Sequence, residues 1–273
     1  ADSQDPAVPQ PASADPWAPL VLLQQGGDAE PPLFLIHAVG GNVLNYRALA
    51  RKLPREQTVY GLQALGLDGR TLPLDTVEAM AARYVSEIRK VQSAGPYRVA
   101  GGSMGGIISY EIAQQLKAAG ERIAFLGLFD TSSGRLENAP AGGSRALRYL
   151  QGLSFQRVCN GLVARARAWR RRLRVRLARA IGAELPHEIR YAEVHRVHYR
   201  ASCRYSVKPY DGDIVVYRAM DQQGRFPDSP TLGWAGYVRR VTVKDIPGNH
   251  DDLVEAEELA FELRASLAEA AGS

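Results

Sequence analysis

The sequence is poor in several features that mark special classes of protein. It holds two cysteines, Cys159 and Cys203, and their spacing fits no metal site. We therefore expect packing residues of an intracellular, cytoplasmic protein rather than a disulfide framework. It has no run of eighteen apolar residues, so we expect no membrane-spanning helix. Its first residues lack the basic and apolar regions of a signal peptide.

What is present is an ordinary globular composition with an unusual start. Of 273 residues, 45% are hydrophobic and 23% are charged, which fits a folded domain and excludes disordered or collagen-like chains. Residues 1–17 are instead polar and carry four prolines, a composition typical of linkers. We interpret them as a linker that joins a domain at residues 18–273 to the rest of a longer chain.

The positive charge is concentrated in one stretch. The net charge is +5, but residues 157–204 hold thirteen arginines, three glutamates and no lysine, so this stretch carries +10 and the remainder −5. Three interpretations fit: a nucleic-acid site, a solvated helix face, or a docking face for an acidic protein partner. We favour the last two and expect no nucleic-acid partner.

Short apolar runs alternate with helical patterns along most of the chain. The runs that predict buried strands are 33–37, 58–62, 97–100, 123–129, 213–218 and 241–246. The helical patterns are 75–90, 104–119 and 254–270. Asp75-Thr76 is the predicted cap of the first, and Gly120 closes the second. The alternation predicts an α/β fold with a mostly parallel, doubly wound sheet.

The alternation breaks at about residues 133–209, which predicts an insertion. Two amphipathic helical patterns lie there, the first over residues 158–181 with arginines on its polar faces. The second has its apolar residues at Tyr191, Val194, His198, Ala201 and Tyr205. A helical pair inserted between strands at this place predicts a lid over the site.

The motif with the clearest chemistry is Gly101-Gly102-Ser103-Met104-Gly105. It follows a predicted strand and precedes a predicted helix, which is the context that a G-x-S-x-G nucleophile elbow requires. A tight turn exposes the serine hydroxyl above the sheet, and the glycines remove side chains that would clash there. The helix behind it presents N–H groups to developing negative charge. Ser103 is therefore the predicted nucleophile.

A serine nucleophile needs a base and an acid. His250 follows the last predicted strand, where an α/β-hydrolase fold places its histidine. Two carboxylates follow predicted strands, Asp130 after 123–129 and Asp221 after 213–218, and either can fix the histidine tautomer. The pattern of residues leaves this choice open.

Two backbone N–H groups are expected to hold the oxyanion. One belongs to Met104, which follows the nucleophile, and the other to Val39 in the loop after the first predicted strand. Because Gly40 and Gly41 have no side chains, the backbone of this loop can approach the reacting groups closely. Asn42 is expected to cap the next helix. We expect His37 to brace this loop rather than to act as the base.

Five segments together resemble the type I thioesterase domains that terminate nonribosomal peptide synthetases and polyketide synthases, within the α/β-hydrolase superfamily. The segments are HAVGG at 37–41, GGSMGG at 101–106, LGLFDT at 126–131, KPYDGDIVVYRA at 208–219 and DIPGNH at 245–250. The resemblance runs from about Pro31 to the C-terminal helix. It implies that Asp130 rather than Asp221 is the acid and that the linker follows a carrier domain. Gly102 departs from the family, which often has an aromatic residue or histidine there.

The resemblance also implies an activity: release of an acyl or peptidyl chain from a phosphopantetheinyl carrier domain through an acyl-serine intermediate, by hydrolysis or macrocyclisation. We expect no metal and no cofactor of the domain's own, because the phosphopantetheine arm belongs to the carrier. The expected contacts of the insertion with carrier or substrate are Arg165, Arg170, Arg174 and His198. The alternatives are a free-standing or editing thioesterase, a general carboxylesterase, and a non-catalytic binding module built on this fold or on the basic helix.

Overall fold

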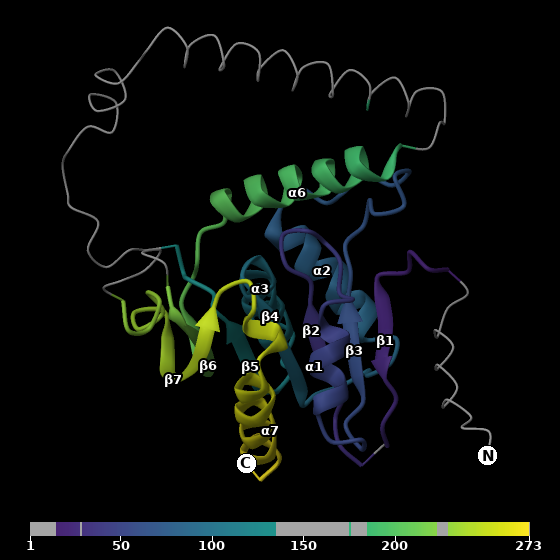
Figure 1. Cartoon of the computed structure of the whole chain (residues 1–273). Coiled ribbons are helices and arrows are strands. Elements are labelled where there is room, and N and C mark those ends of the chain that lie inside the picture. Colours follow the sequence, from purple (N-terminus) through teal and green to yellow (C-terminus); the bar gives the residue numbers. More distant parts are fainter. Residues whose placement is uncertain (1–14, 28, 135–174, 176–184, 223–228, 273) are drawn as a thin grey trace, which may run out of the picture.

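The computed structural model describes residues 15–27, 29–134, 175, 185–222 and 229–272, which form an α/β fold. Its centre is a seven-stranded sheet in the order β1-β3-β2-β4-β5-β6-β7 (Figure 1). Edge strand β1 is antiparallel to β3, and the other strands pair in parallel. The strands are β1 Leu20–Gln24, β2 Leu33–Ile36, β3 Val59–Leu62, β4 Tyr97–Gly102, β5 Ile123–Phe129, β6 Tyr210–Asp221 and β7 Val238–Asn249. The helices are α1 Tyr46–Lys52, α2 Val77–Ile88, α3 Met104–Ala118, α6 His187–Arg204 and α7 Glu257–Ala271, with a 3-10 turn at Leu253–Glu255.

Strand β2 shows why the sheet is doubly wound. Its four residues are all fully buried, because helices cover both of its faces. Leu33 and Leu35 pack in one cluster with residues of α1 and α7, whereas Phe34 and Ile36 pack in another with residues of α2 and α3. The continuous apolar run in the sequence therefore corresponds to a strand without a solvent-exposed face.

The predicted alternation of strands and helices is confirmed, with differences in extent. Strand β1 is not among the predicted strands, since its residues are only half-buried at the edge of the sheet. Strands β6 and β7 reach twelve residues each, beyond the apolar runs, because they pair with one another along most of their length. The predicted end signals of two helices are present: Thr76 Oγ1 accepts the Ala79 N–H at 3.2 Å, and Gly120 has a φ of 82° just after α3.

The prediction that Asn42 caps the next helix is wrong. Its Oδ1 accepts the Leu44 N–H at 2.6 Å and closes a local turn instead. Helix α1 begins later, at Tyr46, with Asn45 at the N-cap position and no side-chain capping bond. A short polar side chain after two glycines fits either a cap or a turn, and the bond to the Leu44 N–H shows that it closes a turn here.

Helix α6 is the described part of the predicted insertion. It crosses one end of the central sheet, above α2 and α3 in Figure 1. Of the five residues of the predicted stripe, Val194, His198 and Ala201 are buried and Tyr205 is half-buried, whereas Tyr191 is exposed. The predicted stripe is therefore confirmed over its middle part. The first helical pattern of the insertion, over 158–181, lies outside the described residues apart from Val175.

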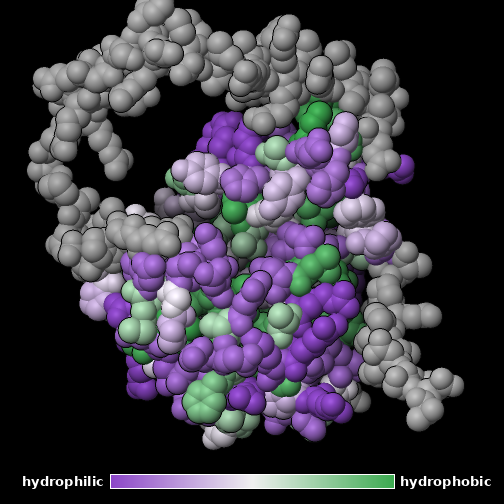
Figure 2. All heavy atoms as spheres, in the orientation of Figure 1, coloured by the Kyte–Doolittle hydropathy of each residue, from purple (hydrophilic) through white to green (hydrophobic). Residues whose placement is uncertain are grey.

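The face of the molecule shown in Figure 2 is mainly hydrophilic. On the face shown in Figure 2, hydrophobic side chains lie singly or in small groups among hydrophilic ones. Scattered exposed residues such as Leu44, Leu72 and Phe261 are normal for a folded domain. Among the described helices, none combines the length and apolar character that crossing a membrane requires.

Candidate active site

Ser103 occupies a tight turn between strand β4 and helix α3. Its φ of 54° and ψ of −121° lie in a region that residues with a side chain rarely adopt, so the turn is strained. Nearby glycines allow this packing. A Cβ at Gly105 would come within 2.6 Å of the His37 carbonyl oxygen. A Cβ at Gly106 would overlap the Thr131 side chain. The elbow therefore packs directly against the loops that follow β2 and β5.

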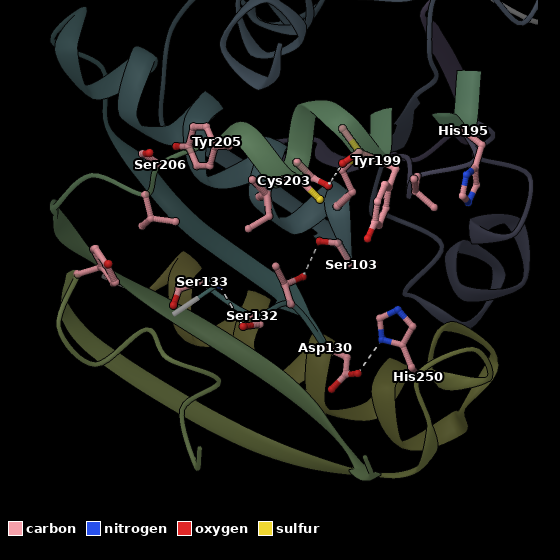
Figure 3. A pocket seen from close by; sticks show the side chains of 18 of the residues that line it. Ser103, Asp130, Ser132, Ser133, His195, Tyr199, Cys203, Tyr205, Ser206 and His250 are labelled. Carbon is pink, nitrogen blue, oxygen red and sulfur yellow. Dashed lines mark hydrogen bonds and ion pairs between the residues drawn. The ribbon is translucent and has the colours of Figure 1, made fainter. Parts of the chain in front are cut away.

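Asp130, directly after β5, binds the histidine that follows β7. His250 Nδ1 donates to Asp130 Oδ2 over 2.6 Å (Figure 3). Asp130 Oδ1 accepts the Ala219 N–H at 3.0 Å and Gln222 Nε2 at 2.7 Å. With Nδ1 of His250 carrying the hydrogen, Nε2 of the neutral ring is left as the proton acceptor.

The surroundings of Asp130 favour its charged form. Burial alone would raise the pKa of this carboxyl, but the hydrogen bonds from His250, Gln222 and Ala219 outweigh burial and hold the pKa below its ordinary value. Although Asp130 is only 2% exposed, it is thus a carboxylate at neutral pH. A fixed carboxylate of this kind can hold a histidine tautomer and stabilise an imidazolium.

One cavity of about 860 Å³ brings the predicted reacting groups together (Figure 3). It is lined by Ser103, Asp130, His250, Val39 and Met104, among others. Ser103 and His250 are both described, and no hydrogen bond joins them; such bonds often tighten only when substrate is bound. Within the described ranges, no three His, Cys, Asp or Glu side chains are grouped as metal ligands.

Helix α6 forms a second wall of this cavity. His195, Tyr199 and Cys203 follow one another at single-turn spacing and line the cavity near Ser103 (Figure 3). Sequence reasoning missed this face because it followed the apolar stripe, which faces the body of the protein. The regular i, i+4 spacing of the three residues was a signal that could have revealed them.

The loop after β2 is held by hydrogen bonds to one carbonyl. His37 Nδ1 and the Gly41 N–H both donate to the Ala38 carbonyl oxygen, over 2.7 and 2.9 Å. The hydroxyl oxygen of Tyr84, a residue of α2, lies 2.6 Å from His37 Nε2. In a trans peptide the carbonyl and the N–H point in opposite directions, so fixing the Ala38 carbonyl also fixes the Val39 N–H. This geometry agrees with the expectation that His37 braces the loop.

The remaining predicted residues are placed as follows. Asp221, the alternative acid, ends β6 opposite Asn249, and the carboxylate that contacts His250 is that of Asp130. His198 is 1% exposed, and its Nδ1 contacts the Val39 carbonyl oxygen at 3.1 Å. Arg165, Arg170 and Arg174 lie outside the described residues. Gln222 was missed, because a single polar residue after a strand carries no motif.

Comparisons with known proteins agree with this architecture. A family model described as a thioesterase domain matches residues 31–149. Over 268 residues the chain is 28% identical to atromentin synthetase invA2 of Paxillus involutus, a match that covers 92% of this chain and 28% of that protein. A solved four-domain nonribosomal peptide synthetase bound to AMP and glycine is 26% identical, with a TM-score of 0.66 over 92% of this chain and 20% of that one. The NocB thioesterase domain shares the fold at 22% identity, with a TM-score of 0.65 over 92% of this chain and 99% of that one.

The extents of these matches are informative. The chain spans 28% of the length of its curated relative but nearly the whole of the solved NocB domain. The family match includes Ser103, Asp130 and the loop after β2, whereas His250 lies beyond it. It is the fold, through strand β7, that brings His250 to the matched residues.

Proposed function

We propose that the chain is a thioesterase domain, in line with the family match over residues 31–149. In this proposal it releases an acyl or peptidyl chain from the phosphopantetheine arm of a carrier domain, by way of an acyl-Ser103 intermediate. The observation that carries this proposal is the Asp130–His250 hydrogen bond beside Ser103 in a single cavity. The likeness to a nonribosomal peptide synthetase supports a terminal release step in secondary-metabolite biosynthesis.

Acylation begins when His250 Nε2 removes the hydroxyl proton of Ser103 and Oγ attacks the thioester carbonyl. The N–H groups of Val39 and Met104 hold the oxyanion of the tetrahedral intermediate. Met104 is the first residue of α3, where N–H groups have no acceptor within the helix. As the carbon–sulfur bond breaks, the imidazolium gives its proton to the departing thiolate. Asp130 stabilises the imidazolium between these two steps.

Release repeats these steps with a second nucleophile. His250 deprotonates either water, which gives a free acid, or an amine or hydroxyl of the bound chain, which gives a ring. The cavity has room beside Ser103 for a segment of the chain. In this proposal the domain contributes no cofactor, because the phosphopantetheine is part of the substrate.

The proposed partner is an acidic carrier domain upstream in the same chain. The linker composition of residues 1–17 and the greater length of the curated relative support this arrangement. We assign docking to the arginine-rich stretch, through Arg165, Arg170 and Arg174. Cys203 is exposed and lines the cavity, so the expectation that it is a packing residue is wrong. Its free thiol is compatible with the cytoplasmic location that we expect for this reaction.

The docking proposal is tested by reversing these three arginines to glutamate. Turnover of a carrier-bound thioester should fall at least about tenfold, since electrostatic attraction mainly accelerates encounter. Turnover of a small acyl-pantetheine should stay within about twofold, because the reacting groups are unchanged. An equal loss on both substrates would contradict docking at this stretch.

The reaction itself is tested by the mass of the intact protein after mixing with an acyl-pantetheine thioester. Wild type should gain one acyl group, and Ser103→Ala should gain none. Ser132→Ala is the matched control, because Ser132 lines the same cavity and has no part in the proposed steps. Loading of Ser103→Ala at the wild-type rate would refute the nucleophile.

The products then separate the alternatives. The mass of the released chain distinguishes hydrolysis from ring formation by one water molecule. Faster turnover of matched oxygen esters than of thioesters would favour a general carboxylesterase. Absence of an adduct with thioesters, with oxygen esters and with a serine-directed phosphonate would favour a binding module.

A further inference from the structure

Helix α6 contacts the loop after β2, residues 37–41, with one stripe of residues. We call this segment the oxyanion loop, after the proposed role of Val39. Tyr191 lies over Gly40, so close that a Cβ there would come within 2.5 Å of the phenol oxygen. One helical turn further, Val194 packs on the same loop, and His198 Nδ1 lies 3.1 Å from the Val39 carbonyl oxygen. These positions share one helix face. The inserted helix, and not the sheet, therefore covers this side of the loop.

His198 and His37 form a stacked pair between the inserted helix and the sheet. Their ring centroids are 5.0 Å apart and their planes differ by 15°. Each Nδ1 contacts a backbone carbonyl oxygen, which can only accept, so each Nδ1 carries the hydrogen. The Nε2 of His37 then accepts the hydroxyl of Tyr84, over 2.6 Å. The pair is thus fixed in defined tautomers.

Both rings are neutral at physiological pH. Burial, with a smaller contribution from the nearby His198, outweighs the hydrogen bond to Ala38 and lowers the pKa of His37 to about 3. Burial likewise lowers the pKa of His198 to about 4. Two neutral rings can stack face to face, whereas two imidazolium rings would repel one another.

We propose that His198 is a positioning residue of the oxyanion hole, which makes the inserted helix part of the catalytic apparatus. The Val39 N–H lies between two fixed carbonyls: His37 holds that of Ala38, and His198 holds that of Val39 itself. Loss of the bond between His198 and the Val39 carbonyl would let the loop rotate and turn the Val39 N–H away from the oxyanion. The inference rests on the proposed chemistry of Ser103 and on the proposed role of Val39.

Two substitutions separate the hydrogen bond from the packing. His198→Phe keeps a ring that can stack on His37 but removes the donor. His198→Asn loses the ring but retains an N–H near the position of Nδ1. His187→Phe and His187→Asn are the matched controls, because His187 lies on the same helix and is exposed.

The readout is the rate of covalent labelling by an alkyl fluorophosphonate, which needs no knowledge of the natural acyl chain. Ser103 Oγ bonds to phosphorus, fluoride leaves, and His250 takes the serine proton. The phosphoryl oxygen occupies the place of the oxyanion. We expect His198→Phe to label at least about tenfold more slowly than wild type, less than the loss of a whole donor costs. His198→Asn should label within about threefold of wild type, and the His187 variants within about twofold.

On any ester or thioester that wild type turns over, the loss in His198→Phe should fall on kcat and not on KM, because the oxyanion forms only in the transition state. Equal slowing of both His198 variants would overturn the inference in favour of packing. Labelling of both at the wild-type rate would also overturn it.

A measurement on wild type covers the case in which His198→Phe fails to fold. The ¹⁵N shifts of the imidazole rings should show a hydrogen on Nδ1 of His198 and of His37; a hydrogen on Nε2 of His198 instead would overturn the inference. If wild type labels with the phosphonate but turns over no thioester, the proposed function fails while this inference is still decided. Absence of labelling in wild type would contradict both the assignment of Ser103 as the nucleophile and this inference.

Discussion

The two halves of the candidate site are fixed by different parts of the molecule. Ser103, Asp130 and His250 follow strands β4, β5 and β7, and the bonds that orient Asp130 come from residues at the ends of β6 and β7. The oxyanion loop also follows a strand, but side chains hold it, and one of them, His198, belongs to the inserted helix. The first half is a property of the sheet, and the second depends on the insertion.

This difference separates two kinds of change that the protein can undergo. Altering α6 should leave the Asp130–His250 pair in place and weaken only the stabilisation of the oxyanion. Altering the ends of the strands should remove the base or the nucleophile itself.

The largest effect is expected from Asp130→Asn. An amide cannot stabilise the imidazolium and favours the wrong histidine tautomer, so kcat should fall by roughly a thousandfold or more. Asp221→Asn is the matched control and should stay within about threefold, because its carboxylate is not the one that orients His250. Steady-state kinetics on an activated ester measures kcat for both variants. A larger loss in Asp221→Asn than in Asp130→Asn would show that Asp221 is the acid.

A large effect on stability is expected from Gly105→Ala. The added methyl would meet the backbone oxygens of Ile36 and His37, which cannot move without shifting β2 and the loop after it. The free energy of unfolding should drop by about 3 kcal/mol, at the upper end of what overpacking costs. Denaturant unfolding measures it, and an unchanged midpoint would mean that the two halves are not packed as tightly as the structure indicates.

An intermediate effect on stability is expected when the pH is lowered, because it acts on the two histidines that hold the oxyanion loop. The pKa values of His37 and His198 are lowered from 6.5 to about 3 and about 4, so the unfolded chain binds protons that the folded chain does not. Stability should therefore be complete above about pH 6.5 and fall as the pH decreases towards 4, by on the order of 1 kcal/mol per pH unit for each ring.

Urea unfolding between pH 7 and pH 4.5 tests this slope, above the range in which Asp130 titrates. His198→Asn should reduce the slope by about one bound proton. Besides burial, His198 lowers the pKa of His37, and His195 lowers the pKa of His198. An unchanged slope in the variant would place the acid sensitivity elsewhere.

The smallest effect is expected from Gly102→Ala, one residue before the nucleophile. A Cβ there would meet nothing closer than the Tyr46 hydroxyl at 3.4 Å, an ordinary contact. The Gly102 N–H can keep its 2.9 Å bond to that hydroxyl. The free energy of unfolding should change by less than about 1 kcal/mol, since a compatible glycine-to-alanine change acts mainly on the unfolded chain. A loss of unfolding free energy as large as that of Gly105→Ala would mean that there is no room for a Cβ at Gly102.

Much of the first half could be predicted from the sequence. The strand–turn–helix context of G-x-S-x-G located Ser103, and the position after the last strand located His250, because parallel strands carry such groups at the same edge of the sheet. The choice between Asp130 and Asp221 could not be derived from the pattern. Both follow strands, and only the three-dimensional contact with His250 separates them.

The second half was decided by tertiary structure. The sequence determined the fold class, the elbow and the glycines of the oxyanion loop, because local periodicity and turn chemistry are short-range properties. It did not reveal that Asn42 closes a turn, that Gln222 donates to Asp130, or that His198 and His37 stack across 161 positions of the chain. Those outcomes depend on which surfaces meet when α6 packs on the loop after β2, and no spacing along the chain encodes the geometry of that contact.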